Sequence, residues 1–220
     1  MRNFEYFAPT QVIFGKDTHL QIGTLLKGQN CHKVLIHYGG HSAVKSGLID
    51  EIKKNLDEAG IAYVTLGGVV PNPRLSKVRE GIELCRRENV DFLLAVGGGS
   101  VIDSCKAIGY GLANPETDVW KFFLRTETPK ACLPVGVILT IAASGSEMSN
   151  SCVITNEEGW LKRSTARNDL CRPRFAILNP RLTYTLPQYQ TESGCVDILM
   201  HTMERYFVNI ETMEITDSIS

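Results

Sequence analysis

Apolar and polar positions follow two alternating rhythms along the first two-thirds of the chain. Short apolar runs rich in β-branched residues alternate with stretches in which apolar residues return every three or four positions. The apolar runs predict four strands and their exit loops, at 33–40, 62–73, 90–100 and 132–141. The run at 90–100 shows no alternation, which is typical of a strand with both faces covered. Strands that alternate with helices predict a parallel sheet with helices on both of its faces.

Three helices are predicted between these strands. The first is indicated by apolar residues that share one helical face, namely Val44, Leu48, Ile49, Ile52 and Leu56. The second is marked by Leu75, Val78 and Ile82, and the third covers 101–114. Each predicted helix therefore has an apolar side that can cover the sheet.

The pattern changes after about residue 142. Residues 151–165 predict a hairpin that turns at Glu158 and Gly159, and 174–187 predicts another short strand with a polar exit. From Pro187 the pattern is helical. We predict an α/β fold, with an N-terminal Rossmann-like parallel sheet domain at 1–185 and the first helices of an all-helical domain at 186–220. The second segment is too short to bury a core alone.

Composition and charge exclude several classes of protein. The chain has 220 residues, 43% of them hydrophobic, and a formal net charge of −1, so it lacks the electrostatic footprint of nucleic-acid or anionic-membrane binding. No apolar run reaches the roughly 18 residues of a transmembrane helix, and the first residues do not resemble a signal peptide. Seven dispersed cysteines without a C-x-x-C pair suit reduced thiols. We expect a cytoplasmic protein with no membrane or nucleic-acid partner.

The strongest local signal for chemistry is the stretch AVGGGSVID, residues 95–103. Gly98 and Gly99 end a predicted strand, and Ser100 opens a helix. A backbone without side chains can approach a phosphate closely, and a helix N-terminus favours an anion. The stretch differs from the usual G-x-G-x-x-G fingerprint, because Ile102 stands at the position of the third glycine. The alternative is a tight turn that holds no ligand.

The first predicted strand ends in YGGHS, residues 38–42. In many dinucleotide sites an acidic residue at such a strand end binds the ribose 2′-hydroxyl of NAD. Here Gly39, Gly40 and Ser42 offer no acid, and Lys45 follows. This composition favours NADP(H). The alternative is a glycine turn in which Ser42 caps the next helix.

Hydroxyl side chains follow the fourth predicted strand, in ILTIAASGSEMSN, residues 138–150. Thr140, Ser144 and Ser146 can contact a phosphate or a sugar. Ser144 and Glu147 also have the spacing of a helix capping box, which is the alternative interpretation. Lys162, just past the predicted hairpin turn, is by default a solvated lysine.

Asp197 and His201 stand four residues apart in GCVDILMHTMERYF, residues 194–207. Positions i and i+4 lie on the same face of a helix, whereas Val196 and Met200 follow the apolar rhythm of that helix. The pair predicts half of a metal site. The alternatives are a buried Asp–His pair and a helix rim that faces water.

Together these stretches resemble the iron-containing (group III) alcohol dehydrogenase family. The resemblance covers the whole chain in order and is carried by FGKDT, YGGHSAVKSGL, VVPNP, AVGGGSVID, LTIAASGSEMS, LNPRLTYTLP and GCVDILMHTMERYF. The stretch YGGHSAVKSGL is most similar to the NADPH-dependent butanol dehydrogenase branch. Other branches often carry aspartate at the position of Gly39 and prefer NAD. His41 departs from the glycine common in that branch.

The resemblance implies that Asp197 and His201 bind a catalytic divalent metal, iron or zinc. In the family, two further histidines on later helices complete this site. The five histidines of this chain stand at 19, 32, 37, 41 and 201. We therefore expect the sequence to end before the remaining ligands and before most of the helical domain. No catalytic residue beyond the metal site is identifiable.

The resemblance also implies a set of NADP(H)-binding residues. Positions near the adenosine end are matched by Gly39, Gly40, Ser42 and Asn72. Positions of the pyrophosphate loop are matched by Gly98, Gly99 and Ser100. Positions around the phosphates, ribose or nicotinamide are matched by Asp103, Thr140, Ser144, Lys162 and Leu182.

The implied function is an oxidoreductase that interconverts primary alcohols and aldehydes by metal-assisted hydride transfer with NADP(H). The implied partners are a small-molecule alcohol or aldehyde and, for a full-length protein, a second identical chain. One alternative is a nucleotide-binding module without catalysis. Another is a related glycerol dehydrogenase-like enzyme or dehydroquinate synthase, which the branch motifs disfavour.

Overall fold

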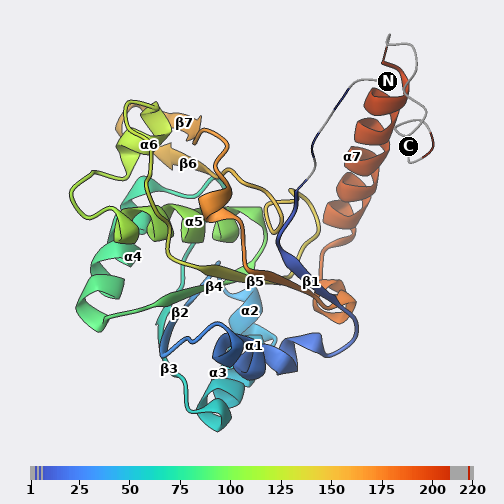
Figure 1. The fold of residues 1–220 in the computed structure, drawn as a ribbon. Coiled ribbons are helices and arrows are strands. Elements are labelled where there is room, and N and C mark those ends of the chain that lie inside the picture. Colours follow the sequence, from blue (N-terminus) through green and yellow to red (C-terminus); the bar gives the residue numbers. More distant parts are fainter. Residues whose placement is uncertain (1–2, 4, 6, 209–217, 219–220) are drawn as a thin grey trace. The chain divides into compact units, whose positions relative to one another are not determined.

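A six-stranded parallel sheet forms the centre of the larger part of the molecule (Figure 1). The computed structural model describes residues 3, 5, 7–208 and 218. The sheet has the order β1-β8-β5-β4-β2-β3. Its strands are β1 (Gln11–Phe14), β2 (Lys33–Tyr38), β3 (Ala62–Leu66), β4 (Phe92–Gly97), β5 (Val135–Leu139) and β8 (Phe175–Leu178).

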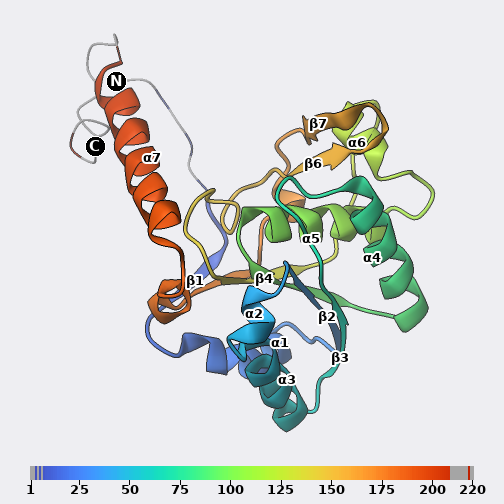
Figure 2. The ribbon, with the colours of Figure 1, turned by 180° about the vertical axis from the view of Figure 1, so that it is seen from behind.

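Helices cover both faces of this sheet, as Figures 1 and 2 show from opposite sides. One face is covered by α1 (Ile22–Gly28), α2 (Ser42–Lys45) and α3 (Leu48–Ala59). The other is covered by α4 (Leu75–Glu88), α5 (Gly99–Ala113) and α6 (Trp120–Leu124). Short 3-10 helices complete this part: η1 (Thr18–Gln21), η2 (Glu158–Trp160), η3 (Asp169–Cys171) and η4 (Pro180–Thr183). The predicted α/β, Rossmann-like fold class is confirmed.

The central strand β4 has all six of its residues buried. Its side chains divide between two cores, because successive residues of a strand point to opposite faces. Leu93 packs with the α4 and α5 side of the sheet, whereas Phe92 and Leu94 pack with the α1 and α3 side. The unbroken apolar run in the sequence therefore reflects a strand that is covered on both faces.

The helix predicted from Val44 onwards is interrupted in the structure. Gly47 takes a left-handed conformation with φ of 80° and separates α2 from α3. Leu48 and Ile52 on α3 are buried as predicted, but Val44 on α2 is 46% exposed. The prediction that Val44 shares the buried face is wrong, because the break changes the direction of the chain before that face begins.

The predicted hairpin is confirmed as β6 (Val153–Asn156) and β7 (Leu161–Ser164), an antiparallel pair. Gly159 lies in the turn with φ of 75°, which suits glycine. The hairpin packs against α5 and α6 rather than joining the main sheet. The hairpin therefore lies on the outside of the helical layer that contains α5 and α6.

The sequence pattern does not predict β1 or α1. Strand β1 lies at the edge of the sheet, where Val12 and Phe14 are 43% and 73% exposed. The apolar run of this four-residue edge strand is only three residues long, Val12–Phe14, so its hydrophobic pattern is short. Its pairing with β8 runs in parallel, with Gln11 opposite Phe175.

The chain divides into two compact units, Pro9–Thr183 and Met1–Ala8 with Tyr184–Ser220. The second unit contains α7 (Gln188–Tyr206), which confirms the helical pattern predicted after Pro187. No residue of α7 is buried by the part of the chain that the structure describes. The predicted boundary between folding domains at 185 and 186 stays a prediction.

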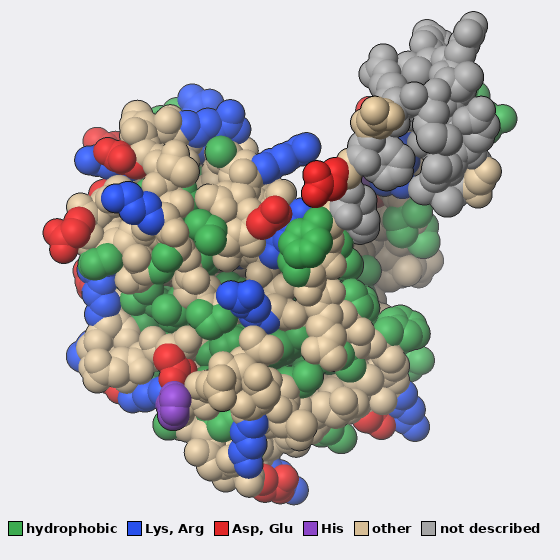
Figure 3. Space-filling view, in the orientation of Figure 1, with side chains coloured by type: hydrophobic (Ala, Val, Ile, Leu, Met, Phe, Trp, Pro, Cys, Tyr) green, Lys and Arg blue, Asp and Glu red, His purple; other side chains and the backbone are tan. Residues whose placement is uncertain are grey.

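The described surface mixes both signs of charge. On the face shown in Figure 3, acidic and basic side chains are interspersed, with apolar side chains between them. Among the described helices, none combines the length and the hydropathy that would let it cross a bilayer.

Candidate functional site

Two glycine-rich strand ends meet where the order of the strands reverses. From β2 the chain moves outwards to β3, and it then returns to form β4 on the other side of β2. Tyr38 and Val96 are partners across the β2–β4 pair, so the residues that follow these two strands lie at the same edge of the sheet. In open α/β sheets, ligands bind at this kind of switch point, outside the carboxyl ends of the strands.

The turn after β4 leads directly into α5. Gly98 is extended, with φ of −97° and ψ of −168°, and the helix begins at Gly99. The first turn of this 15-residue helix contains no acidic residue, so no carboxylate neutralises the positive end of its dipole. The Thr140 amide, just past β5, donates to the carbonyl of Gly97 at 3.2 Å. The predicted residues Gly98, Gly99 and Thr140 therefore lie together.

The glycines of this turn allow the loop after β5 to pack closely against it. A β-carbon on Gly98 would lie 2.4 Å from Cγ2 of Ile141. A β-carbon on Gly99 would lie 2.3 Å from Oγ of Ser144. Both distances are shorter than carbon contacts in folded proteins, so any larger residue would displace the loop. The structure thus brings the Ser144 hydroxyl directly to the phosphate-binding turn predicted from the sequence.

The end of β2 is held by the segment after β3. The Gly68 amide donates to the Gly39 carbonyl at 2.8 Å, and the Val69 amide donates to the Tyr38 carbonyl at 3.3 Å. A β-carbon on Gly39 would make only ordinary contacts, 3.5 Å from the carbonyl oxygen of Val69. Gly40 faces open space, with nothing within 4 Å of such an atom. This strand end therefore has room for a ligand beside it.

Ser42 opens α2, and His41 occupies the capping position without a side-chain capping bond. The alternative in which Ser42 caps this helix is wrong, because the helix begins one residue too early for it. Ser42 is exposed, so its hydroxyl is free to meet a ligand.

Asn72 takes a left-handed conformation, with φ of 57°, and is exposed. The next residue, Pro73, accepts a hydrogen bond from the Thr155 amide at 2.8 Å. Arg74 stacks on Trp160, with its guanidinium carbon 4.6 Å from the ring centroid. The exit loop predicted to bind the adenosine end is therefore anchored to the β6–β7 hairpin.

Asp103 belongs to a partly buried network on α5. Its Oδ1 accepts from the Ser146 hydroxyl at 2.5 Å, and its Oδ2 accepts from the Val153 amide at 3.0 Å. Burial raises the pKa of the Asp103 carboxyl above its ordinary value, while Ser146 and the positive charges of Lys106 and Lys162 oppose that shift. Both carboxylate oxygens thus have protein partners, and Asp103 links α5 to the hairpin.

The remaining predicted cofactor residues lie around this region. Ser144 accepts a bond from the Ser146 amide at 3.3 Å, and no helix begins among the described residues there, so the capping-box alternative is wrong. Ser146 is buried. Lys162 is exposed on β7, opposite Thr155. Leu182 is half-buried in η4 and packs against the core on the α1 and α3 side.

The predicted metal ligands lie on α7. Asp197 Oδ2 and His201 Nε2 are 3.7 Å apart, and their side chains are 58% and 60% exposed. The buried-pair alternative is therefore wrong. The carboxylate of Glu204 lies 3.6 Å from the other ring nitrogen of His201.

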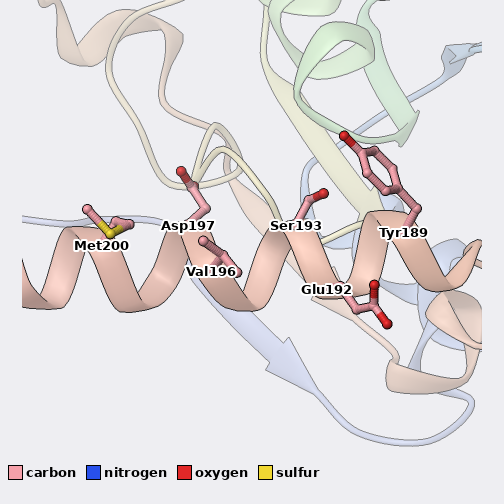
Figure 4. Close-up of a pocket in the computed structure, with 6 residues that line it drawn as sticks. All are labelled: Tyr189, Glu192, Ser193, Val196, Asp197 and Met200. Carbon is pink, nitrogen blue, oxygen red and sulfur yellow. The ribbon is translucent and has the colours of Figure 1, made fainter.

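A shallow hollow of about 380 Å³ runs along α7 beside Asp197. It is lined by Tyr189, Glu192, Ser193, Val196, Asp197 and Met200. Figure 4 shows Tyr189, Ser193 and Asp197 projecting from the same side of the helix. This spacing of four residues makes a polar stripe that continues to His201.

The donors on this stripe suit a divalent metal but do not complete its coordination. A carboxylate and an imidazole are ligands that zinc and iron accept, and such sites normally have three or four protein ligands. Among the described residues, no group of three or more His, Cys, Asp or Glu side chains is arranged to hold a metal ion. Asp197 and His201 therefore fit part of a metal site.

Sequence reasoning missed Lys106, which is completely buried on α5 and contacts the segment that carries Ser146. The sequence signal for it is a lysine in the middle of a largely apolar helix, three residues after Asp103. Burial lowers the pKa of Lys106 below its ordinary value.

Comparisons with known proteins agree on one family. Residues 9–180 match the family model described as iron-containing alcohol dehydrogenase. A probable NADH-dependent butanol dehydrogenase 2 of Bacillus subtilis is 46% identical over 219 residues, which cover 99% of this chain and 55% of that protein. The NADPH-dependent aldehyde reductase YqhD of Escherichia coli is 37% identical, covering 99% of this chain and 55% of that protein.

A solved structure of NADH-dependent butanol dehydrogenase A from Thermotoga maritima superposes with a TM-score of 0.93 at 40% identity, covering 100% of this chain and 54% of that one. The chain spans about half the length of the curated relatives it matches. The family model covers most of the sequence and includes the strand ends described above, and on this evidence the chain belongs to the iron-containing alcohol dehydrogenase family.

Proposed function

We propose that this chain is the nucleotide-binding part of an oxidoreductase that interconverts primary alcohols and aldehydes by hydride transfer. One observation carries the proposal: the glycine-rich ends of β2 and β4 and the hydroxyl-rich exit of β5 converge at the switch point of a parallel sheet. That arrangement suits the two phosphates and the ribose groups of a dinucleotide. The names of the similar proteins support the reaction class.

The proposed residues divide the cofactor among three regions. The N-terminus of α5 receives the pyrophosphate through Gly98, Gly99 and Ser100. The adenosine end lies against Gly39, Gly40, Ser42 and Asn72. The ribose and nicotinamide end lies near Asp103, Thr140, Ser144, Lys162 and Leu182. Bound in this way, the nicotinamide supplies the hydride chemistry, and the chain orients it.

NADP(H) is the proposed form of the cofactor. The segment from Tyr38 to Leu48 contains no acidic residue, so no carboxylate there would bind a ribose 2′-hydroxyl or repel a 2′-phosphate. The similar proteins carry both cofactors in their names, NADH in the Bacillus protein and NADPH in the Escherichia coli protein. The proposed preference for NADP(H) over NAD(H) therefore rests on the absence of an acidic residue at the end of β2.

Replacing Gly39 with aspartate should shift the preference towards NADH. The site has room for the side chain, because a β-carbon there contacts the carbonyl oxygen of Val69 at 3.5 Å. We expect NADPH affinity to fall by about tenfold or more, since a carboxylate repels the 2′-phosphate. The measurement is fluorescence titration with NADPH and NADH at one salt concentration.

The matched control is Gly39→Asn, which has the same shape without the charge and should change the preference much less. Tighter binding of NADH than NADPH by the unmodified chain would contradict the proposal. So would an unchanged preference in the folded Gly39→Asp variant.

Asp197 and His201 are the proposed ligands of the divalent metal, iron or zinc. When bound, such a metal polarises the alcohol or carbonyl oxygen of the substrate. The carboxylate of Asp197 and the imidazole of His201 lie on the same face of α7, with Oδ2 and Nε2 3.7 Å apart. Further ligands are needed to complete the coordination.

The chain on its own should bind zinc or iron weakly and turn over butanol negligibly. The two proposed donors, Asp197 and His201, lie together on α7, and both side chains are more than half exposed. The test combines equilibrium dialysis with Zn²⁺, metal analysis and an assay with butanol and NADP. We expect Asp197→Asn and His201→Asn each to remove the residual metal binding.

One equivalent of metal that survives washing with a chelator would contradict this prediction. Turnover that depends on both residues would also contradict it, and it would indicate ligands from a partner chain. Replacing Glu192, which lines the same hollow on α7, with glutamine is a matched control that should not alter metal binding.

A nucleotide-binding module without catalysis is the second candidate, favoured by the absence of a three-ligand cluster among the described side chains.

All seven cysteines are free thiols, which supports the cytoplasm as the proposed compartment. A homodimer is the proposed assembly of the longer protein.

A further inference from the structure

The ammonium group of Lys106 is buried in the interior of the α5 side of the molecule. The residue has no exposed surface. Its Nζ lies within hydrogen-bond distance of five oxygens: the carbonyls of Ser146 at 2.7 Å, Ser149 at 3.0 Å and Ser151 at 3.0 Å, and the hydroxyls of Ser146 at 3.2 Å and Ser149 at 3.0 Å. A buried charge is costly unless such groups compensate it.

All five acceptors belong to one short segment, 146–151. The hydrogen-bond donors of Lys106 therefore tie a single loop to the middle of α5. No carboxylate contacts the ammonium group directly in the described structure, and Asp103 is connected to it through the Ser146 hydroxyl. The loop is thus held by a cation that it surrounds, rather than by an ion pair at the surface.

The hydroxyl groups of Ser146 and Ser149 each donate their proton to a partner other than Lys106. The Ser146 hydroxyl donates to Asp103 Oδ1 at 2.5 Å, and the Ser149 hydroxyl donates to the Ser151 carbonyl at 3.1 Å. Each oxygen is then left to accept from Lys106, which has only protons to offer. The three protons of the ammonium group are shared among the five oxygens. Removing the ammonium group would leave several of these oxygens without a donor at once.

The same loop reaches the predicted phosphate-binding turn. The Ser146 amide donates to Oγ of Ser144 at 3.3 Å. Ser144 in turn packs against Gly99, so closely that a β-carbon on Gly99 would lie 2.3 Å from its Oγ. A continuous series of contacts thus runs from Lys106 through Ser146 to the first residues of α5.

We propose that Lys106 is a positioning residue for the cofactor: it fixes the 146–151 segment so that Ser144 stays in place over the phosphate-binding turn. The inference rests on the proposed function. Lys106 has no exposed surface with which to contact the cofactor, so it acts through the loop. The loss of its ammonium group should loosen the loop while the sheet remains intact.

Lys106→Met is the direct test, because methionine keeps much of the side-chain volume and removes the charge. We expect NADPH affinity to fall by about tenfold at a temperature where circular dichroism shows a folded chain. Amide hydrogen exchange should become faster in 146–151 and remain unchanged in β2. A role limited to general stability would accelerate exchange in both segments.

Ser149→Ala supplies a milder test that does not remove a buried charge. It deletes one acceptor of Lys106 and one hydrogen bond within the loop, and Ser149 is not among the proposed cofactor-binding residues. We expect a smaller loss of NADPH affinity with faster exchange confined to 146–151. If Lys106→Met does not fold, the NADPH affinity of Ser149→Ala tests the proposal instead.

Two results would overturn the inference. One is wild-type NADPH affinity in a folded Lys106→Met or Ser149→Ala variant. The other is faster exchange throughout the sheet. If the unmodified chain binds neither NADPH nor NADH, the proposed function itself is wrong, and that result is distinct from a chain that binds cofactor without depending on Lys106.

Discussion

Replacing Gly98 with valine should weaken the binding of NADPH by more than about tenfold, roughly 1.4 kcal/mol, while the chain remains folded. Gly98 precedes α5 and lies against the loop after β5. A β-carbon there would lie 2.4 Å from Cγ2 of Ile141, so a branched side chain must displace that loop or occupy the space where the pyrophosphate approaches. Fluorescence titration measures the loss, with circular dichroism as the check of folding.

Two further variants separate these effects. Gly98→Val combined with Ile141→Ala relieves the clash but leaves the branched side chain beside the phosphate, so binding should stay weak. Gly28→Val lies at the end of α1, where a β-carbon would meet nothing within 4 Å, and it should bind the cofactor normally. Unchanged affinity in a folded Gly98→Val variant, or full recovery in the double variant, would mean that this turn does not receive the pyrophosphate.

The free energy of unfolding should fall by up to about 3 kcal/mol as the pH is lowered from 6.5 towards 4, through the single residue His37. His37 lies on β2 and is completely buried. Its Nδ1 donates to the Leu66 carbonyl at 2.8 Å, so Nε2 accepts from the Ser104 hydroxyl at 2.9 Å. Burial, together with the nearby positive charge of Lys77, lowers the pKa of His37 to about 4, although the hydrogen bond to the Leu66 carbonyl and the negative charge of Glu80 oppose this shift.

The direction of this pH dependence follows from how many protons the folded and the unfolded chain bind. The unfolded chain takes up a proton near pH 6.5, whereas the folded chain resists it until about pH 4. Between these values the unfolded state binds more protons, so stability falls as the pH falls, and below pH 4 this group adds no further loss. Urea unfolding at several pH values measures the slope.

The matched variant is His37→Asn, which removes the titrating group. Its absolute stability will be lower, because a buried residue has been changed, but its stability should depend less steeply on pH between 4 and 6.5 than that of the wild type. Parallel curves for the two proteins over this range would contradict the assignment.

Much of the fold could be predicted because its central strands carry unbroken apolar runs. All six residues of β4 are buried, because both faces of the strand are covered. Such a strand has an unbroken apolar run in the sequence, which predicts it. Strand β1 could not be predicted, because Phe14 and its neighbours are largely exposed at the edge of the sheet. The break between α2 and α3 was missed because a single residue, Gly47, takes a left-handed conformation.

The candidate site divides in the same way. Gly98 and Gly99 were found from local spacing, because the chemistry of a phosphate-binding turn is contained in a few consecutive residues. The network of Lys106 and Ser146 could not be found from spacing, since its two residues lie 40 positions apart in the sequence. Burial of Ser146 also changes its role, from a free hydroxyl to a structural link with Asp103.

Hydrogen exchange of the unmodified chain with and without NADPH tests most directly whether the ends of β2, β4 and β5 form a dinucleotide site. We predict slower exchange on cofactor binding in residues 39–42, 98–101 and 140–146, with β1 and α1 unchanged. An absence of protection at saturating NADPH and NADH, or protection confined to residues outside these three segments, would contradict the account.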